Sequence, residues 1–86
     1  MLVKYIGPTQ VLRGGSLNPK NTNDFPEINV EQNKEYDVDI QLDGPQMIIN
    51  NVPVIHPDAT LWVIFPNLGR VPYSKDCIKH HWEINL

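Results

Sequence analysis

The chain has 86 residues, of which 41% are hydrophobic and 20% charged, and its formal net charge is −3. This length predicts one domain, 1–86, with a thin core, and eight prolines with five glycines argue against long helices. The sequence has no run of about 18 apolar residues that could span a membrane, and residues 1–5 lack the pattern of a signal peptide. A single cysteine excludes an internal disulfide, which suits a cytoplasmic domain. Because no apolar span is present, we expect no membrane partner.

Acidic residues are concentrated in the middle of the chain. Residues 24–58 contain eight of them against a single basic residue, Lys34, whereas residues 1–23 and 59–86 are mildly basic. An acidic surface repels phosphate backbones, so general nucleic-acid binding is disfavoured. The charge distribution favours a protein partner with a basic surface.

The first third of the chain predicts short elements around a loop. Residues 2–6 have the β-branched and aromatic content of a strand, and a Gly-Pro pair ends it. Residues 9–13 are compatible with a short extension or with a turn of helix. Residues 14–27 are rich in Asn, Asp, Gly, Ser and Pro, which predicts a long loop that is mobile or functional. Residues 28–30 are expected to begin or to border a paired strand.

The clearest strand signal lies in residues 35–43. Apolar and polar side chains alternate there, and a period of two places one set on the core and the other in water. The expected core set is Tyr36, Val38, Ile40 and Leu42. The expected solvent set is Glu35, Asp37, Asp39, Gln41 and Asp43.

The second half of the chain predicts a central strand. Residues 46–50 are a weaker strand candidate, and residues 51–57, with two prolines, predict a loop or an irregular edge. Residues 59–65 are a continuous apolar run between prolines, which is typical of a central strand. Its alternation puts Trp62 and Ile64 on one face, so one tryptophan is expected near the surface.

The C-terminal part predicts one helical turn between two strands. Residues 71–73 can pair only at a sheet edge, because Pro72 lacks an N–H. Residues 74–77 predict a single helical turn capped by Ser74, and residues 82–86 alternate as a closing strand. The chain therefore predicts an all-β fold of five or six short strands in a small, strongly curved sheet or barrel.

Three segments carry a resemblance to a known family. Residues 3–7 read Val-Lys-Tyr-Ile-Gly, and residues 33–38 read Asn-Lys-Glu-Tyr-Asp-Val. The first resembles the opening strand of small SH3-like β-barrels, and the second resembles the GK-x-Y-x-V pattern at the entry to their second strand. The third segment, residues 73–78 followed by 82–84, resembles their short turn and closing strand. Asn33 stands where that pattern has its turn glycine. The resemblance, to barrels found among short bacterial and prophage proteins, implies a partly open SH3-like barrel and a phage or prophage setting, and it implies no reaction.

The candidate binding residues are the carboxylates of the solvent set, namely Glu35, Asp37, Asp39 and Asp43. Alternate residues of one strand face the same side about 7 Å apart, so these side chains line up. Such a row is compatible with a solvated face that discourages edge-to-edge aggregation, a docking surface for a basic protein or a calcium site. A flat strand does not wrap a calcium ion, so we expect no metal.

Cys77, His80 and His81 are the nearest approach to a metal or catalytic cluster. A structural zinc site needs about four ligands, and no second pair accompanies Cys77 and His80. No flanking signature supports a cysteine nucleophile. We therefore expect Cys77 to be buried as a small hydrophobic residue, and we expect neither a cofactor nor catalysis.

The sequence favours a non-catalytic protein-binding or assembly module that acts through the acidic strand and adjacent loops. In a phage or prophage setting this is an accessory protein that blocks a host protein, or a particle component in which residues 14–27 order on assembly. The alternative is a nucleic-acid-binding barrel whose basic residues converge on one face. That basic set is Lys4, Arg13, Lys20, Arg70, Lys75 and Lys79.

Overall fold

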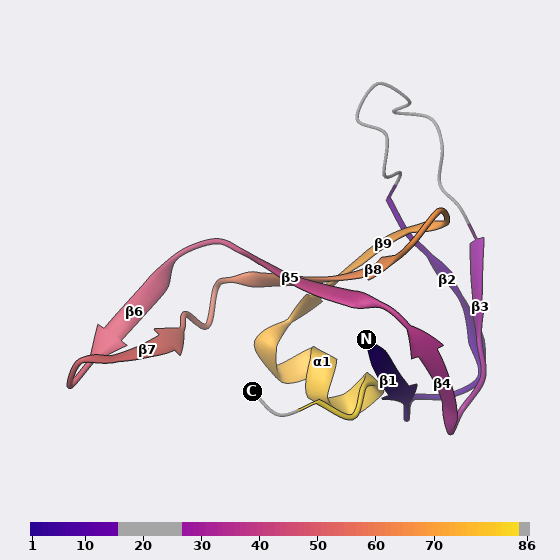
Figure 1. The fold of residues 1–86 in the computed structure, drawn as a ribbon, viewed down its shortest axis with the longest axis horizontal. Helices are drawn as coiled ribbons and strands as arrows, with labels where there is room; N and C mark the ends of the chain where they lie inside the picture. The colour runs from indigo at the N-terminus through magenta and orange to yellow at the C-terminus, as the bar shows by residue number, and fades with distance from the viewer. Residues whose placement is uncertain (16–26, 85–86) are drawn as a thin grey trace.

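The structure of the protein, a computed structural model, describes residues 1–15 and 27–84. Within these ranges the chain forms nine short strands and one helix, α1 (Lys75–His81) (Figure 1). The strands are β1 (Leu2–Tyr5), β2 (Gln10–Arg13), β3 (Glu27–Val30), β4 (Lys34–Asp37), β5 (Asp39–Asp43), β6 (Gln46–Ile49), β7 (Val52–Ile55), β8 (Thr60–Phe65) and β9 (Gly69–Ser74). The all-β prediction is confirmed, and the described strands form open sheets. The predicted loop at 14–27 falls for the most part outside the described residues.

Two antiparallel ribbons, each bent in the middle, make up most of the fold. In the first ribbon β1 pairs with β4 and β2 pairs with β3, and the bend falls at residues 6–9 and 31–33. In the second ribbon β5 pairs with β8 and β6 pairs with β7, with the bend at residues 44–45 and 56–59. A bend interrupts the ladder of hydrogen bonds. The described chain therefore has nine short strands where the sequence pattern predicted five or six.

The strand β8 lies in the middle of a three-stranded sheet of order β5-β8-β9. This position confirms the central strand predicted at residues 59–65 and the edge position predicted from Pro72. Along β8, Leu61 and Phe65 are buried, whereas Trp62 is half-buried on the opposite face. The predicted alternation is correct, and one tryptophan lies near the surface.

Asparagine residues form several of the tight turns. Asn33, Asn50, Asn51 and Asn67 have positive φ angles of 68°, 52°, 63° and 64°, a region that asparagine tolerates better than most residues. Asn50 and Asn51 join β6 to β7, and positive φ at both positions is typical of a type I′ hairpin turn. Of the two alternatives expected at residues 51–57, a loop or an irregular edge, the loop is wrong for residues 52–55, because this turn closes a hairpin that contains β7.

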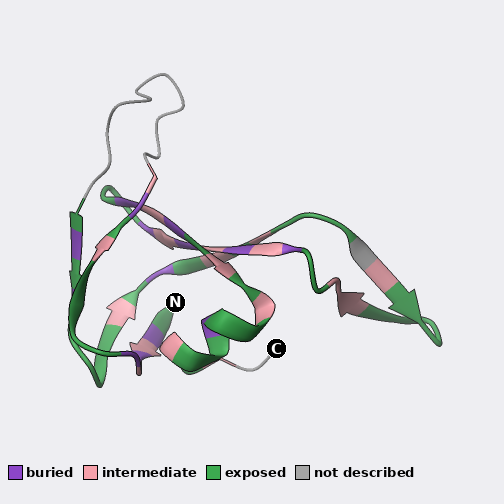
Figure 2. Cartoon of the chain, turned by 180° about the vertical axis from the view of Figure 1, so that it is seen from behind, coloured by how far each residue is buried: buried purple, intermediate pink, exposed green. Residues whose placement is uncertain are grey.

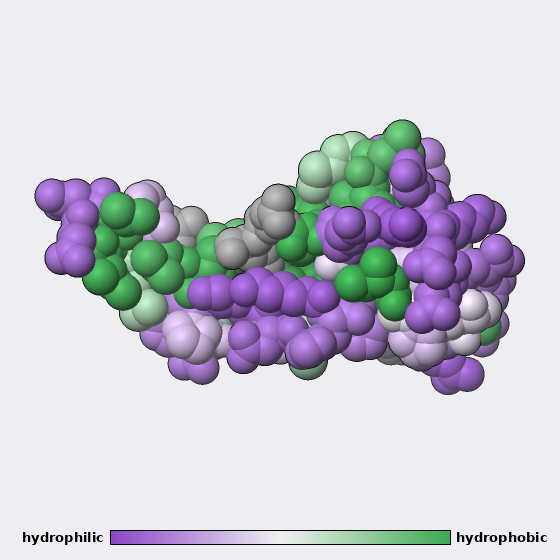
Figure 3. Space-filling model, turned by 90° about the horizontal axis from the view of Figure 1, so that it is seen from below, coloured by the Kyte–Doolittle hydropathy of each residue, from purple (hydrophilic) through white to green (hydrophobic). Residues whose placement is uncertain are grey.

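The hairpin of β6, β7 and their turn, residues 46–55, projects from the rest of the described chain, and we call it the arm (Figure 1). Figure 2 shows buried residues gathered outside the arm, and none of the arm's described side chains is buried. Figure 3 shows hydrophobic side chains along the arm beside its polar tip.

The helix α1 is longer than the single turn predicted at residues 74–77. Ser74 caps it as expected, since its Oγ accepts a hydrogen bond of 3.2 Å from the Cys77 N–H. The helix continues because Ile78 and Trp82, one turn apart, both pack in the core with 0% exposure. No helix among the described residues has the length and apolar content needed to cross a membrane.

The closing strand predicted at residues 82–86 is corrected by the structure. Trp82 forms only an isolated bridge with Tyr5, and the Glu83 N–H donates to the Lys4 carbonyl at 2.9 Å. The cause is the longer helix, which uses the Trp82 N–H for its own last hydrogen bond. The final two residues of the predicted strand lie outside the described part of the chain.

Trp82 lies at the centre of the hydrophobic core. Its ring centroid is 5.1 Å from that of Tyr5, 5.8 Å from that of Phe65 and 6.2 Å from that of Tyr36. These three partners belong to β1, β8 and β4, so one side chain joins the end of α1 to both ribbons. Aromatic pairs at such distances contribute about 0.5–1.5 kcal/mol each beyond the burial of their area.

Val38 provides a test of the alternation between core-facing and solvent-facing side chains along β4 and β5. Its side chain has 0% exposure, although its neighbours Asp37 and Asp39 are exposed. We expect Val38→Asp to unfold the domain, because an unpaired carboxylate is costly to bury. The same change at the exposed Gln41 should alter the free energy of unfolding by only about 0.5 kcal/mol. Urea denaturation followed by circular dichroism measures both, and equal losses would contradict the assignment of faces.

Tyr73 is a half-buried tyrosine next to α1. Burial raises the pKa of its hydroxyl above the ordinary value of 10.0, and the nearby Trp82 indole opposes part of that shift. The two groups do not reach hydrogen-bond geometry, and neither has a partner among the described residues, so burial dominates. The folded state therefore favours the neutral phenol. Its contribution to stability is present below the unfolded pKa and is lost as the pH rises through the raised value.

An alkaline titration should show an ionisation step of Tyr73 above the ordinary tyrosine pKa. The absorbance of tyrosinate measures this step directly. Tyr73→Phe should remove the late step. An unchanged amplitude of the late step in this variant would contradict the assignment.

Candidate interaction surface

The four candidate carboxylates lie on the solvent side of two consecutive strands, and we call them the acidic row. The strand predicted at residues 35–43 is divided at Val38, because β4 pairs with β1 whereas β5 pairs with β8. The alternation continues across the break, so all four acids remain exposed as expected. The acidic row consists of Glu35 and Asp37 on β4 and of Asp39 and Asp43 on β5.

The amino group of Met1 lies at the centre of the acidic row. Its nitrogen is 2.8 Å from Asp37 Oδ1 and 3.9 Å from Asp39 Oδ1, and all these groups are exposed. The hydrogen bond to Asp37, with smaller contributions from the charges of both carboxylates, raises the pKa of the Met1 amino group above 8.0. One positive charge therefore offsets the middle of the row. Glu35 and Asp43 form no ion pair with any other described residue.

The acidic row borders the outer face of the three-stranded sheet. Directly opposed residues of antiparallel strands share a face. The register places Asp39 opposite Ile64, and Ile64 opposite Arg70. In the same way Gln41 lies opposite Trp62. The carboxylates of β5 thus share their face with an apolar centre on β8 and a guanidinium on β9.

Trp62 and Arg70 form a contact that the sequence pattern did not reveal. The guanidinium carbon of Arg70 lies 4.2 Å from the centroid of the Trp62 ring, which is a cation–π contact. The Arg70 backbone also exchanges hydrogen bonds of 2.7 Å and 3.0 Å with Gly15. A Cβ at Gly14 would lie 2.5 Å from the Arg70 carbonyl oxygen, so only glycine fits there. Arg70 is therefore held against the sheet.

The basic residues of the alternative hypothesis are dispersed. Arg13 pairs with Glu27 at 3.7 Å, and Arg70 stacks on Trp62. Those that the structure describes belong to β1, β2, β9 and α1, and only the two lysines of α1 lie one helical turn apart. Lys20 lies outside the described residues. Two of these five described residues are thus engaged in contacts of their own, and the two lysines of α1 are neighbours.

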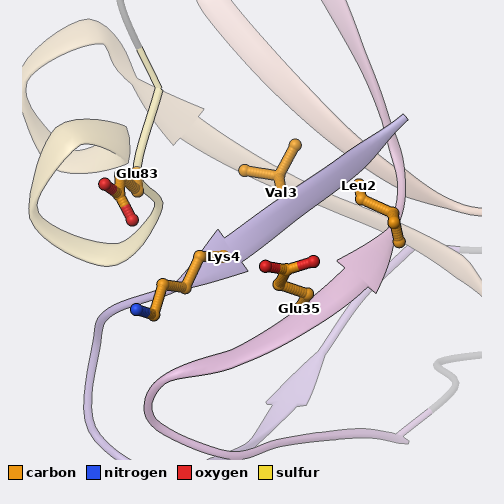
Figure 4. A pocket seen from close by; sticks show the side chains of 5 residues that line it. All are labelled: Leu2, Val3, Lys4, Glu35 and Glu83. Atoms are coloured by element: carbon orange, nitrogen blue, oxygen red, sulfur yellow. The ribbon is translucent and has the colours of Figure 1, made fainter.

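A hollow of about 350 Å³ adjoins the acidic row at Glu35. Figure 4 shows Lys4 of β1, Glu35 of β4 and Glu83, which follows α1, projecting around it. Leu2 and Val3 complete its lining. The lining contributes one ammonium and two carboxylates, which gives the hollow a net negative charge, so its chemistry suits a cationic side chain.

Cys77 is exposed, which corrects the expectation that it is buried. On α1 the core-facing position belongs to its neighbour Ile78, and successive residues of a helix point in different directions. His81 Nδ1 lies 3.0 Å from the Cys77 carbonyl oxygen, and its ring packs beside Tyr5 and Tyr73. Among the described residues, no three His, Cys, Asp or Glu side chains are grouped so that they could bind a metal ion.

The chemistry of this region is that of a binding surface with separated charges. Exposed carboxylates and an acidic hollow lie beside an apolar centre that carries a stacked guanidinium. The acidic row was identified from sequence alone, whereas the hollow and the Trp62–Arg70 contact depend on strand register. No family model, no curated protein and no solved structure matches this chain.

Proposed function

We propose that the protein is a non-catalytic protein-binding or assembly module that presents the acidic row to a partner with a basic surface. The observation that carries this proposal is that the acidic row is only partly neutralised: the Met1 amino group offsets Asp37 and Asp39, whereas Glu35 and Asp43 have no ion-pair partner among the described residues. Among the described residues, no lysine or arginine side chain forms an ion pair with any of the four carboxylates. Neighbouring like charges repel each other in the free protein, and an oppositely charged partner relieves that repulsion.

The hollow beside Glu35 adds a second element to this proposal. A lysine or arginine of the partner could enter it and meet the carboxylates of Glu35 and Glu83. A flat row of exposed charges mainly accelerates association, whereas a charge held in a concave site is less screened by salt. The acidic row would thus direct the partner, and the hollow would hold it.

We further propose an SH3-like, partly open barrel and a role as a cytoplasmic phage or prophage accessory protein, or as a component of the particle. Support for the fold comes from its short strands and from the helix α1 near the C-terminus, the one helix among the described residues. Asn33 also adopts the positive φ that the turn glycine of the SH3-like pattern would adopt. Nucleic-acid binding is the rival proposal, and it is supported less, because Arg13 is paired with Glu27 and Arg70 is stacked on Trp62.

Reversal of two charges in the acidic row tests the proposed function. Asp39→Lys with Asp43→Lys leaves the contact between Met1 and Asp37 in place. We expect this double variant to lose the proteins that the unmodified chain captures from a bacterial lysate at low salt, because attraction becomes repulsion. Quantitative mass spectrometry of the captured proteins measures the loss. The melting temperature should change little, since both positions are exposed.

A matched control is Glu31→Lys with Asp58→Lys, which makes the same change in net charge at exposed acids outside the row. It should retain the captured proteins. Equal losses in both double variants would show that only the total charge matters. Full retention by the row variant would exclude the acidic row as the docking surface.

A further inference from the structure

The arm exposes apolar side chains that no other described part of the chain covers. Ile48, Ile49 and Val52 have exposures of 75%, 51% and 57%. Residues 44–57 contain no Asp, Glu, Lys or Arg, the longest such run in the chain. An uncharged apolar projection of this kind marks an interaction site on a small domain.

Both faces of the arm are apolar. Opposed residues of β6 and β7 share a face, and the register places Met47 opposite Val54. One face consists of Met47, Ile49, Val52 and Val54. The other face includes Ile48, Pro53 and Ile55. Ile55 packs against the core at the base of the arm. Ile48 and Pro53 continue the same apolar face outward, where no described residue buries them.

The two outer edges of the arm differ. In a hairpin with a two-residue turn, the flanking residues Ile49 and Val52 bond to each other, so the backbone groups of Ile48 and Pro53 point outward. Pro53 has no N–H, which blocks the edge of β7. The strand β6 contains no proline, and among the described residues it pairs only with β7. The outward N–H and C=O groups of Gln46 and Ile48 therefore form an open edge.

We propose that the arm is a dimerisation element, in which β6 pairs antiparallel with β6 of a second copy of this chain. An isolated two-stranded hairpin is marginally stable in water, and this pairing incorporates it into a continuous sheet of order β7-β6-β6-β7. The same edge is used on both copies, so the contact has two-fold symmetry and closes on itself. This proposal does not depend on the function assigned to the acidic row.

The open groups define the register of the pair. Both N–H and C=O groups of Gln46 and Ile48 are used when Gln46 of one copy lies opposite Ile48 of the other. Met47 then faces Met47 of the second copy across the symmetry axis. On that face the side chains form an unbroken apolar row, Val54, Met47, Met47 and Val54, across the joined sheet.

The charge distribution favours a second copy as the occupant of this edge. Two chains of net charge −3 repel each other, and the uncharged arm is a surface that they can join without opposing like charges. In the register above, the paired residues 46–48 carry no charge in either copy. An anionic lipid surface suits the arm less well, because Asp43 and Asp58 flank the apolar run.

Sedimentation equilibrium of the full chain over a concentration series tests the proposal. The mass should rise from 9.9 kDa to twice that value and stop there. Ile48→Lys places a charge on the pairing edge and should remain monomeric. Val11→Lys introduces the same charge at an exposed site outside the arm and should dimerise normally. A monomer at every concentration, whether or not another protein binds the arm, would overturn the proposal, and so would continued growth beyond a dimer.

Disulfide trapping tests the register without relying on a destabilising change. In a Cys77→Ser background, Met47→Cys should form an intermolecular disulfide, since paired Cα atoms at such positions lie about 4.5 Å apart. Val54→Cys is the matched control on the same face of β7, where the two copies of the residue would be roughly 14 Å apart. It should remain reduced under the same mild oxidation. Equal trapping at both positions would contradict pairing through β6.

Discussion

The packing of Trp82 is the contact on which the rest of the fold depends. The described strands form four separate sheets, so no continuous ladder of hydrogen bonds joins the two ribbons. Trp82 touches Tyr5 and Tyr36 of the first ribbon and Phe65 of the second. The neighbouring His81 carbonyl accepts the N–H groups of residues 6 and 7, at the bend of the first ribbon. Removing a buried ring of this size typically costs about 3–5 kcal/mol, a large share of the stability of a small domain.

The features that were predicted from sequence depend on local chemistry. Alternation at residues 35–43 and 59–65 gave the correct faces, because the side-chain period of a strand does not depend on its partner. Ser74 was recognised as a helix cap by its side-chain chemistry, and the edge position of Pro72 followed from its missing N–H. The acidic row was found for the same reason, since exposed acids are visible in the pattern itself.

The features that were missed depend on contacts between distant segments. The extension of α1 follows from the burial of Ile78 and Trp82 against strands that are far away in sequence. Cys77 is exposed for the same reason, because the helix turns Ile78 inward in its place. The hollow requires β1, β4 and the end of α1 to meet. The strand β7 is different, since the Asn50–Asn51 pair is a local hairpin signal, whereas Pro53 and Pro57 after it are typical of a loop.

Pro53 has a consequence for the assembly behaviour of the arm. A ribbon with two open edges resembles a bifunctional monomer, which can add units on both sides and grow into a polymer of indefinite length. Pro53 removes an N–H donor from the edge of β7, which leaves only the edge of β6 open. Pairing with one second copy uses that edge, so no further copy can be added. The residue that made this segment read as a loop in the sequence is thus the residue that separates a closed pair from a fibre.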